Sequence, residues 1–302
     1  MRAVVIGGSG QVGGWLLREL AARGHQAVGT YATVVFPGLV RLDAGDLDKA
    51  SAWVREQRPD VVFYSAGFTW VDGSERDPAR SHSANCVQPV NMARSVAEHG
   101  ARFVNFSTDY VFDGMNGPYS ENDAPNPLSV YGRSKLEAEN RLAEALGDRL
   151  LNLRATWVFG PERQGKNFAY QLCRTLAARK EMVCPSDQFS SPSYGPDVAR
   201  AAVALAERGV SGLVHLAGPE VMDRVAFAGR LATGFGLDPS LIVGKRTAEL
   251  GQGAPRPLRS GLLTPRLDAL LPAAIRPLAN ACADFLDRLS DDPSLARLLP
   301  PQ

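Results

Sequence analysis

The stretch AVVIGGSGQVG at residues 3–13 decides the fold. Its four apolar residues predict a buried β-strand, and the apolar spacing that follows predicts a helix over residues 12–23. Gly7, Gly10 and Gly13 fit the pattern G-x-x-G-x-x-G between these two elements. Glycines at such a junction can serve the conformation of a tight turn alone. They also let the backbone approach a pyrophosphate closely at a helix N-terminus, and the strand–loop–helix context favours this dinucleotide site.

Short apolar runs and helical patterns alternate through the first half of the chain. This regular alternation predicts an α/β protein with right-handed βαβ units and a Rossmann-type, doubly wound parallel sheet. The alternative, an α+β domain with antiparallel strands, fits the alternation less well. The further strands are predicted at residues 26–29, 60–65, 103–107 and 151–154, and the helices at residues 50–57, 84–99 and 129–146.

The alternation loosens after residue 155, where the pattern predicts a smaller, mostly C-terminal domain that binds the substrate. We expect a cofactor domain over residues 1–155, with residues 195–220 packing back onto it, and the substrate domain mainly over residues 156–302. The elements predicted in the second half are helices at residues 199–207, 225–234 and 275–289, a strand at residues 213–216, and proline-rich loops at residues 185–196 and 255–257.

Composition limits the function classes. The formal net charge of +1 gives no electrostatic argument for a nucleic-acid or membrane-surface partner. No stretch reaches the roughly 18 apolar residues that a membrane span needs. The four cysteines are widely spaced and form no C-x-x-C pair, so we expect neither a metal nor a disulfide. A reduced, cytoplasmic setting is the resulting prediction.

Tyr131 and Lys135 form a Y-x-x-x-K pattern on a predicted helix, where a spacing of four places both side chains on one face. Reduction of a carbonyl leaves an alkoxide that must be protonated, and a tyrosine with a pKa of about 10 serves at neutral pH when a cation stabilises its phenolate. The pattern alone also fits a tyrosine beside a solvated lysine. The context is more specific, because Thr108 ends a predicted strand at the sheet edge that binds ligands, and residues 65–67 end the preceding strand with small side chains.

The choice between NADH and NADPH depends on the end of the second strand. Residues 29–33 contain no acid to take the ribose 2′-hydroxyl and no arginine, which slightly favours NADPH. Asp43 is a candidate for the adenine amino group, although a turn or helix-cap aspartate fits it equally well. Asp46 and Asp48 are interpreted as helix caps.

Several motifs resemble the extended short-chain dehydrogenases, and most of all the dTDP-4-dehydrorhamnose reductase family. The most specific is FSTDYVFDG at residues 106–114, which is similar to that family's S-T-D-Y-V-F-x-G. TWVDGSE at residues 69–75 looks like its T-x-V-D-x-x-E, and residues 127–132 resemble its approach to the catalytic tyrosine. The resemblance runs from residue 1 to about residue 265.

The resemblance implies reduction of a 4-keto-6-deoxyhexose nucleotide, most simply dTDP-4-dehydrorhamnose to dTDP-rhamnose, by a catalytic trio of Thr108, Tyr131 and Lys135. For two of the substrate-binding residues that the resemblance implies, a structural role is an alternative: Trp157 fits packing in the protein core equally well, and Arg256 could simply anchor a loop. The expected substrate-binding residues are Thr69, Val71, Thr108, Asp109, Tyr110, Trp157 and Arg256. The expected cofactor-binding residues are Gly7, Ser9, Gly10, Gln11, Val12, Gly13, Thr30, Asp43, Ala44, Ser65, Ala66, Gly67, Ser107, Tyr131 and Lys135.

The chain also departs from the family's sequence pattern, and other functions fit the same motifs. Some bacterial members of the family carry a glutamate after the glycine loop for a magnesium-containing dimer contact, where this chain has Trp15 and its neighbours. We expect no such metal, although a homodimer is possible. The same resemblance extends to the β subunit of methionine adenosyltransferase, a non-catalytic subunit that binds NADP. A third hypothesis is an enzyme that reduces another keto-sugar or ketone.

Overall fold

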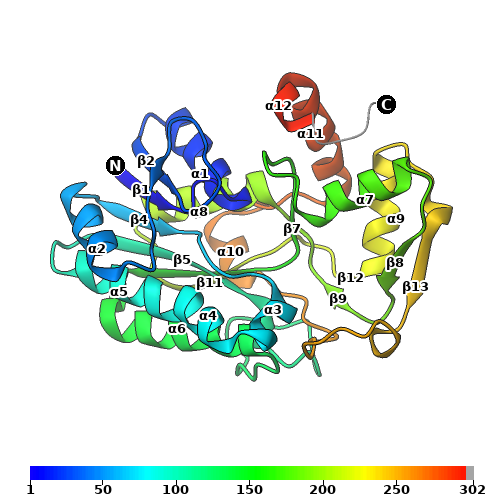
Figure 1. Cartoon of the computed structure of the whole chain (residues 1–302), viewed down its shortest axis with the longest axis horizontal. Helices are drawn as coiled ribbons and strands as arrows, with labels where there is room; N and C mark the ends of the chain where they lie inside the picture. Colours follow the sequence, from blue (N-terminus) through cyan, green and yellow to red (C-terminus); the bar gives the residue numbers. More distant parts are fainter. Residues whose placement is uncertain (297–302) are drawn as a thin grey trace.

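Seven parallel strands form one sheet in the computed structural model, which describes residues 1–296 (Figure 1). Every neighbouring pair in the sheet is parallel, which confirms the predicted Rossmann-type architecture. In spatial order the strands are β11 (Gly212–Leu216), β6 (Leu150–Ala155), β5 (Arg102–Thr108), β4 (Val61–Tyr64), β1 (Arg2–Ile6), β2 (Gln26–Tyr31) and β3 (Val40–Arg41).

Helices cover both faces of this sheet because its strands are apolar on both sides. Along β1, Ala3 and Val5 point into one core, and Val4 and Ile6 point into the other, as the alternation of a strand requires. The first core lies under α1 (Gln11–Ala22) and α8 (Gly195–Glu207), and the second lies under α2 (Leu47–Glu56), α5 (Gln88–Ala97) and α6 (Val130–Leu146).

The strand order reverses between β1 and β4. From β1 the chain runs outward through β2 and β3, and it then returns to β4 and continues outward on the other side through β5 and β6. In open α/β sheets the crevice outside the carboxyl ends of the strands at such a switch point binds the ligand. The segments after β1, β4 and β5 are therefore expected to line the ligand site.

A second lobe follows β6 and lies on the right in Figure 1. Its core gathers aromatic side chains, among them Tyr170, Phe227 and Phe285. The helices and strands of this lobe are β7 (Val158–Phe159), α7 (Phe168–Ala177), β8 (Met182–Pro185), β9 (Phe189–Ser190), β10 (Ser193–Tyr194), β12 (Met222–Asp223), α9 (Arg224–Gly234), β13 (Ile242–Lys245), α11 (Leu278–Asp291) and α12 (Pro293–Ala296).

The structure departs from the predicted elements in several places. The helix expected from residue 84 begins earlier, as α4 (Pro78–His82), because Asp77 caps it and proline fits its first turn. A π-helical turn, Ser83–Val87, then joins α4 to α5. The loop expected at residues 185–196 contains β9 and β10, whose two-residue length gives no periodic signal. Four further helices also escaped prediction, namely α3 (Val71–Arg76), α7, α10 (Pro265–Leu270) and α12.

The division into two domains near residue 155 stays a prediction. Residues 195–216 supply α8 and β11 to the first lobe, where β11 pairs with β6. The last residues of the predicted substrate domain, residues 297–302, lie outside the described part of the chain. Across residues 1–296, no helix combines the length and the apolar character needed to cross a membrane.

Candidate active site

The glycine loop between β1 and α1 is closed against two neighbouring strands. Gly7 has a φ of +84°, and a Cβ added there would lie 2.8 Å from the backbone nitrogen of Ala66. A Cβ on Gly13 would collide with the carbonyl oxygen of Gly7. The Gly7 N–H donates to Thr30 Oγ1 at 3.2 Å. Side chains at these glycines would therefore fill the cradle that a pyrophosphate needs.

The ends of β4 and β5 supply small and hydroxylated residues next to this loop. Ser65 Oγ donates to the Ile6 carbonyl oxygen at 2.9 Å, which ties the end of β4 to β1. Ser107 at the end of β5 is 8% exposed, and its buried hydroxyl has no hydrogen-bond partner within residues 1–296. An orphaned buried hydroxyl at the carboxyl end of β5, two strands from β1, fits a polar ligand such as the nicotinamide half of a dinucleotide.

Three contacts fix the N-terminus of α6, which carries Tyr131. Ser129 caps the helix by accepting from the Gly132 N–H at 3.1 Å. Glu75 on α3 accepts from the Val130 N–H at 2.7 Å, which explains the acid in the TWVDGSE motif. A Cβ on Gly132 would collide with the carbonyl oxygen of Tyr110, so the helix packs directly on the turn after β5. These contacts position Tyr131.

Tyr131 is a buried phenol beside Thr108. Its ring meets the ring of Tyr110 edge to face, with 5.7 Å between the centroids. Burial raises the pKa of Tyr131 above its ordinary value, and the Thr108 side chain lowers it in part. At neutral pH the phenol therefore carries its proton, which is the form that can protonate an alkoxide.

Lys135 lies one helical turn further along α6 and is 5% exposed. Its Nζ donates to the Phe106 carbonyl oxygen at 2.5 Å, which holds the ammonium group against β5. Burial lowers the pKa of Lys135 to about 8, although the neighbouring Glu139 acts in the opposite direction. The lysine is therefore a cation at neutral pH that loses its proton at only slightly higher pH.

The lowered pKa of Lys135 predicts the pH dependence of the reaction. The lysine is charged below about pH 8 and neutral above it, and its charge favours the phenolate that Tyr131 becomes. We expect kcat/KM for reduction to be level at lower pH and to fall as the pH rises through about 8, as initial rates will show. A level profile up to about pH 10, the ordinary titration range of lysine, would contradict this role.

Asp109 follows Thr108 and is enclosed by hydroxyl groups. Its carboxylate accepts from Ser190 Oγ at 3.2 Å and from Ser260 Oγ at 2.5 Å, both contributed by the second lobe. Thr108 Oγ1 donates to its other oxygen at 3.2 Å. Burial raises the pKa of Asp109, and these hydroxyls lower it in part. The carboxylate holds the end of β5 against the second lobe, and its direct contact with substrate stays a prediction.

Arg256 anchors the loop that carries it, which is the alternative that the sequence offered to a contact with substrate. Its guanidinium forms an ion pair with Asp72 at 2.7 Å and is 9% exposed. The same carboxylate accepts from the Ala254 N–H at 3.0 Å, so the aspartate of the TWVDGSE motif holds this loop. The Thr69 side chain is exposed, and the Val71 side chain is half-buried. Contacts of Thr69, Val71 and Arg256 with substrate stay predictions.

Sequence reasoning missed Asn85, which lies in the π-helical turn and is buried. Its amide accepts from the Phe68 N–H at 2.9 Å and donates to the Phe68 carbonyl oxygen at 3.0 Å. It also contacts the hydroxyls of Ser81 and Ser134, and Ser134 lies between Tyr131 and Lys135 on α6. Asn85 therefore joins the loop after β4 to the catalytic helix. No periodic pattern marks a residue of this kind.

Sequence reasoning also missed Arg224, the first residue of α9. Its Cζ lies 3.4 Å from the ring centroid of Trp157 and 4.8 Å from that of Phe168. Trp157 adopts a φ of 39°, a left-handed conformation that is strained for a bulky residue and often marks a functional site. Its ring also stacks on Phe227, so the core-packing interpretation of Trp157 holds for one part of its surface.

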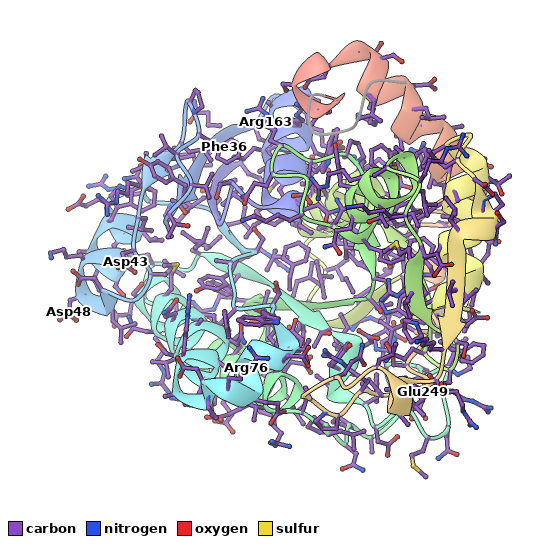
Figure 2. All side chains as sticks on the ribbon, turned by 45° about the vertical axis from the view of Figure 1, so that its right-hand side comes forward. Phe36, Asp43, Asp48, Arg76, Arg163 and Glu249 are labelled. Carbon is purple, nitrogen blue, oxygen red and sulfur yellow. The ribbon has the colours of Figure 1, made fainter. Side chains whose placement is uncertain are left out.

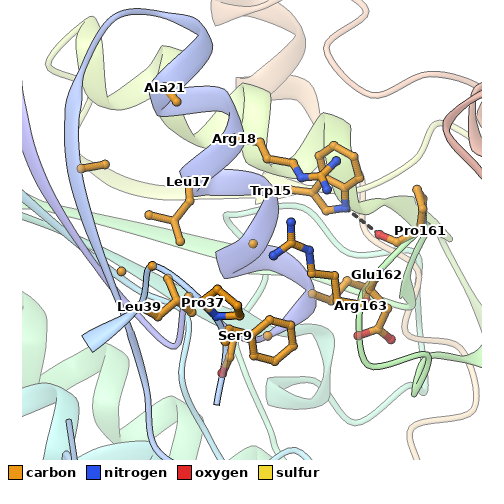
Figure 3. A pocket seen from close by; sticks show the side chains of 18 of the residues that line it. Ser9, Trp15, Leu17, Arg18, Ala21, Pro37, Leu39, Pro161, Glu162 and Arg163 are labelled. Carbon is orange, nitrogen blue, oxygen red and sulfur yellow. Dashed lines mark hydrogen bonds between the residues drawn. The ribbon is translucent and has the colours of Figure 1, made fainter. Parts of the chain in front are cut away.

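A cavity of about 400 Å³ opens beside the glycine loop (Figure 3). Its lining includes Ser9 of the loop, Phe36 of the β2–β3 connection and Arg163 of the segment after β7. Phe36 and Arg163, which come from different lobes, lie close together in Figure 2. The Gln164 amide donates to the Ser9 carbonyl oxygen at 2.6 Å, so this segment is fastened to the glycine loop.

Asp43, Asp46 and Asp48 lie between the end of β3 and the first turn of α2. Asp43 Oδ1 accepts from the Gly45 N–H at 2.8 Å, so it serves a turn, and its contact with adenine stays a prediction. Asp46 caps α2, as expected, whereas Asp48 lies in the first turn of that helix. Residues 29–33 contain no arginine, but the pairing of β3 with β2 places Arg41 beside Tyr31.

One cluster within residues 1–296 has the residue types of a metal site. Candidate ligand atoms of His82, Cys86 and Glu137 lie within 4.8 Å of one another. Arg141 donates to Glu137 at 3.2 Å and to the sulfur of Cys86 at 3.8 Å, and burial raises the pKa of the Cys86 thiol to about 11. A guanidinium and a protonated thiol at this position favour an ion-paired surface over a metal site.

A glycine cradle at the switch point, together with a Thr–Tyr–Lys trio at the end of β5 and on α6, defines a short-chain dehydrogenase/reductase that uses a nicotinamide cofactor. Comparison with known proteins gives the family. The chain belongs to the RmlD substrate binding domain family, whose model matches residues 1–291. The resemblance stated from the motifs is thereby confirmed.

Relatives and solved structures agree with this assignment. The chain is 33% identical to a dTDP-4-dehydrorhamnose reductase of Mycobacterium tuberculosis, over 99% of this chain and 97% of that protein. It is similar to the structure of dTDP-4-dehydrorhamnose reductase from Bacillus anthracis in complex with NADP, with a TM-score of 0.87 and 25% identity over 95% of this chain and 99% of that one. A methionine adenosyltransferase 2 subunit beta of Danio rerio is 29% identical over 94% of this chain and 90% of that protein.

Proposed function

We propose that this protein reduces the 4-keto group of a nucleotide-activated 6-deoxyhexose, most simply dTDP-4-dehydrorhamnose to dTDP-rhamnose, with a nicotinamide cofactor. One observation carries the proposal: the buried Tyr131 phenol has Thr108, from the carboxyl end of β5, beside it and Lys135 one helical turn away. Relatives named for this reaction match the chain over nearly its whole length.

Each member of the trio has a distinct task in this reaction. The reduced nicotinamide supplies a hydride to the carbonyl carbon. Thr108 donates a hydrogen bond to the carbonyl oxygen, where negative charge develops. Tyr131 transfers its proton to that oxygen, so that the ketone becomes an alcohol. Lys135 lowers the energy of the resulting phenolate through its positive charge, because both groups are buried in a medium of low dielectric constant.

The experiment that tests this proposal follows the hydride. NADPH that carries deuterium at the transferred C4 position is incubated with the protein and the keto-sugar nucleotide. We expect the product to carry one deuterium at C4 of the sugar, as mass spectrometry and NMR will show. Unlabelled NADPH is the control. Cofactor oxidation that leaves the sugar without deuterium would reject this substrate in favour of another ketone.

A non-catalytic role is the second candidate, because a regulatory β subunit is among the relatives. Two observations favour catalysis over it. The Thr–Tyr–Lys trio is complete, and the aspartate and glutamate of the TWVDGSE motif hold Arg256 and the start of α6 in place. A homodimer and a cytoplasmic location stay predictions; all four cysteines are free and buried, in keeping with a reducing compartment.

The cofactor preference should favour NADPH, because Arg163 lies at the cavity beside Ser9 and no acid stands at the end of β2 to repel a 2′-phosphate. We expect Arg163→Gln to weaken NADPH binding about 10- to 100-fold, as loss of one charge-assisted hydrogen bond does. NADH binding should hardly change. Calorimetric Kd values for both cofactors give the measurement.

Arg41→Gln is the matched comparison for this variant, because Arg41 lies beside Tyr31 at the end of β2. A selective loss of NADPH affinity in Arg41→Gln, with Arg163→Gln unaffected, would place the 2′-phosphate at β3 and overturn the role of Arg163.

A further inference from the structure

The Arg224 guanidinium forms no direct ion pair within residues 1–296. Within residues 1–296, no carboxylate lies within 4.0 Å of its guanidinium and no hydrogen bond from that group is present. The adjacent Asp223 uses its carboxylate to cap α9, accepting from the Ala226 N–H at 2.9 Å. The five N–H donors of this half-buried guanidinium have no protein partner, so a ligand that supplies acceptors can replace the water they contact.

The position of this guanidinium is set by its surroundings. The Arg224 N–H donates to the Gln188 carbonyl oxygen at 3.1 Å, which fixes the backbone at the start of α9. The rings of Trp157, Phe168 and Phe227 lie around the guanidinium, at 3.4, 4.8 and 5.9 Å from Cζ. Aromatic rings attract a cation but accept few of its hydrogen bonds, so the planar group is held in place with its donors unused.

The same group lies near the turn after β5, which packs on the N-terminus of α6. Tyr110, which packs on the ring of Tyr131, and Asp109 are close enough to raise the pKa of Arg224, while burial lowers it to about 10. Arg224 therefore remains charged at neutral pH. It comes from the second lobe, whereas the glycine loop that receives the cofactor pyrophosphate belongs to the first.

We propose that Arg224 binds the diphosphate of the nucleotide-sugar substrate, with Trp157 holding the guanidinium in the plane that faces it. This inference rests on the proposed function, which gives the substrate two linked phosphates. A guanidinium offers parallel N–H donors that match phosphate oxygens in pairs. One arginine stacked in this way fixes the nucleotide end of the substrate, while the keto-sugar reaches the trio on α6.

Binding of dTDP tests this directly, because dTDP contains the diphosphate and lacks the reacting sugar. We expect dTDP to raise the Tm of the protein, and Arg224→Gln to weaken dTDP binding about 10- to 100-fold. Arg224→Lys keeps the charge without the fork and should lose less. The Kd for NADPH, measured on the same samples, should stay unchanged in both variants and shows that they are folded.

Turnover separates this inference from the proposed function. With the keto-sugar nucleotide, Arg224→Gln should raise KM about 10- to 100-fold with little change in kcat. Normal KM and normal dTDP binding in that variant would overturn the role of Arg224 and leave the reductase intact. Arg224-dependent dTDP binding without any reduction of the keto-sugar would support the diphosphate site and reject the proposed substrate. Failure of dTDP to bind the unaltered protein would overturn the site.

Discussion

Replacing Tyr131 by phenylalanine should lower kcat for reduction by about 10²- to 10⁴-fold, the usual contribution of a positioned general acid. The ring and its packing on Tyr110 remain, and only the hydroxyl beside Thr108 is removed. Because the role proposed for this hydroxyl is proton transfer and the shape of the glycine loop does not depend on it, the Kd for NADPH should stay near that of the unaltered protein. Steady-state rates and calorimetry provide the two measurements.

The control for this variant is Tyr110→Phe, which removes the neighbouring phenol from the same aromatic pair. The proposed mechanism assigns no proton transfer to Tyr110. The kcat of Tyr110→Phe should therefore fall far less than that of Tyr131→Phe. Near-normal turnover by Tyr131→Phe would falsify the assignment of the proton donor. A large and equal loss in both variants would point to disturbed packing between the two rings instead.

Replacing Gly13 by alanine should abolish cofactor binding almost completely, by about 10²-fold or more. The added Cβ collides with the carbonyl oxygen of Gly7, so either the loop or the start of α1 has to move. Backbone cannot yield as a flexible side chain does, and we expect the free energy of unfolding to fall by about 1–3 kcal/mol as well. Calorimetric titration with NADPH and thermal unfolding measure the two effects.

Gly14→Ala provides the matched control one residue further on. A Cβ there would lie 3.6 Å from the Gly8 carbonyl oxygen, which is ordinary contact, and the residue is in a helix. We expect cofactor binding to persist and stability to rise by about 0.5–1 kcal/mol. If Gly13→Ala bound NADPH as well as Gly14→Ala does, the close packing of the loop on α1 would not be what shapes the cofactor site.

The glycine loop and the catalytic helix could be predicted because their signals are local. Each of the two motifs fits within a single strand–loop–helix or helix segment, and their order along the chain matches the order of strands at the sheet edge. The TWVDGSE motif was recognised only by resemblance. Its physical reason appeared with the structure, since Asp72 holds Arg256 and Glu75 caps α6.

Arg163, Arg224 and Asn85 could not be predicted, for two physical reasons. The two arginines belong to the second lobe, where short strands and loops leave little periodicity in the sequence. Asn85 lies in a π-helical turn, and its importance depends on a contact with the backbone of Phe68 seventeen residues earlier. An isolated polar residue has meaning only once its neighbours in space are known.

The substrate contacts expected at Asp109 and Arg256 show the opposite difficulty. Both residues belong to motifs that resemble the family, but their charged groups already bind the protein's own groups, hydroxyls in one case and Asp72 in the other. A motif identifies residues that a site requires, without separating those that touch the substrate from those that hold the site together.

The most direct test of the central claim is the loss of NADPH absorbance with dTDP-4-dehydrorhamnose, generated in place from dTDP-glucose. The unaltered protein and Tyr131→Phe are compared, each with NADPH and with NADH. Turnover that requires Tyr131 is the predicted result, and it would establish the reductase and its substrate class together. Absence of turnover, with NADPH binding demonstrated in the same sample, would contradict the account and shift the function to another ketone or to a regulatory subunit.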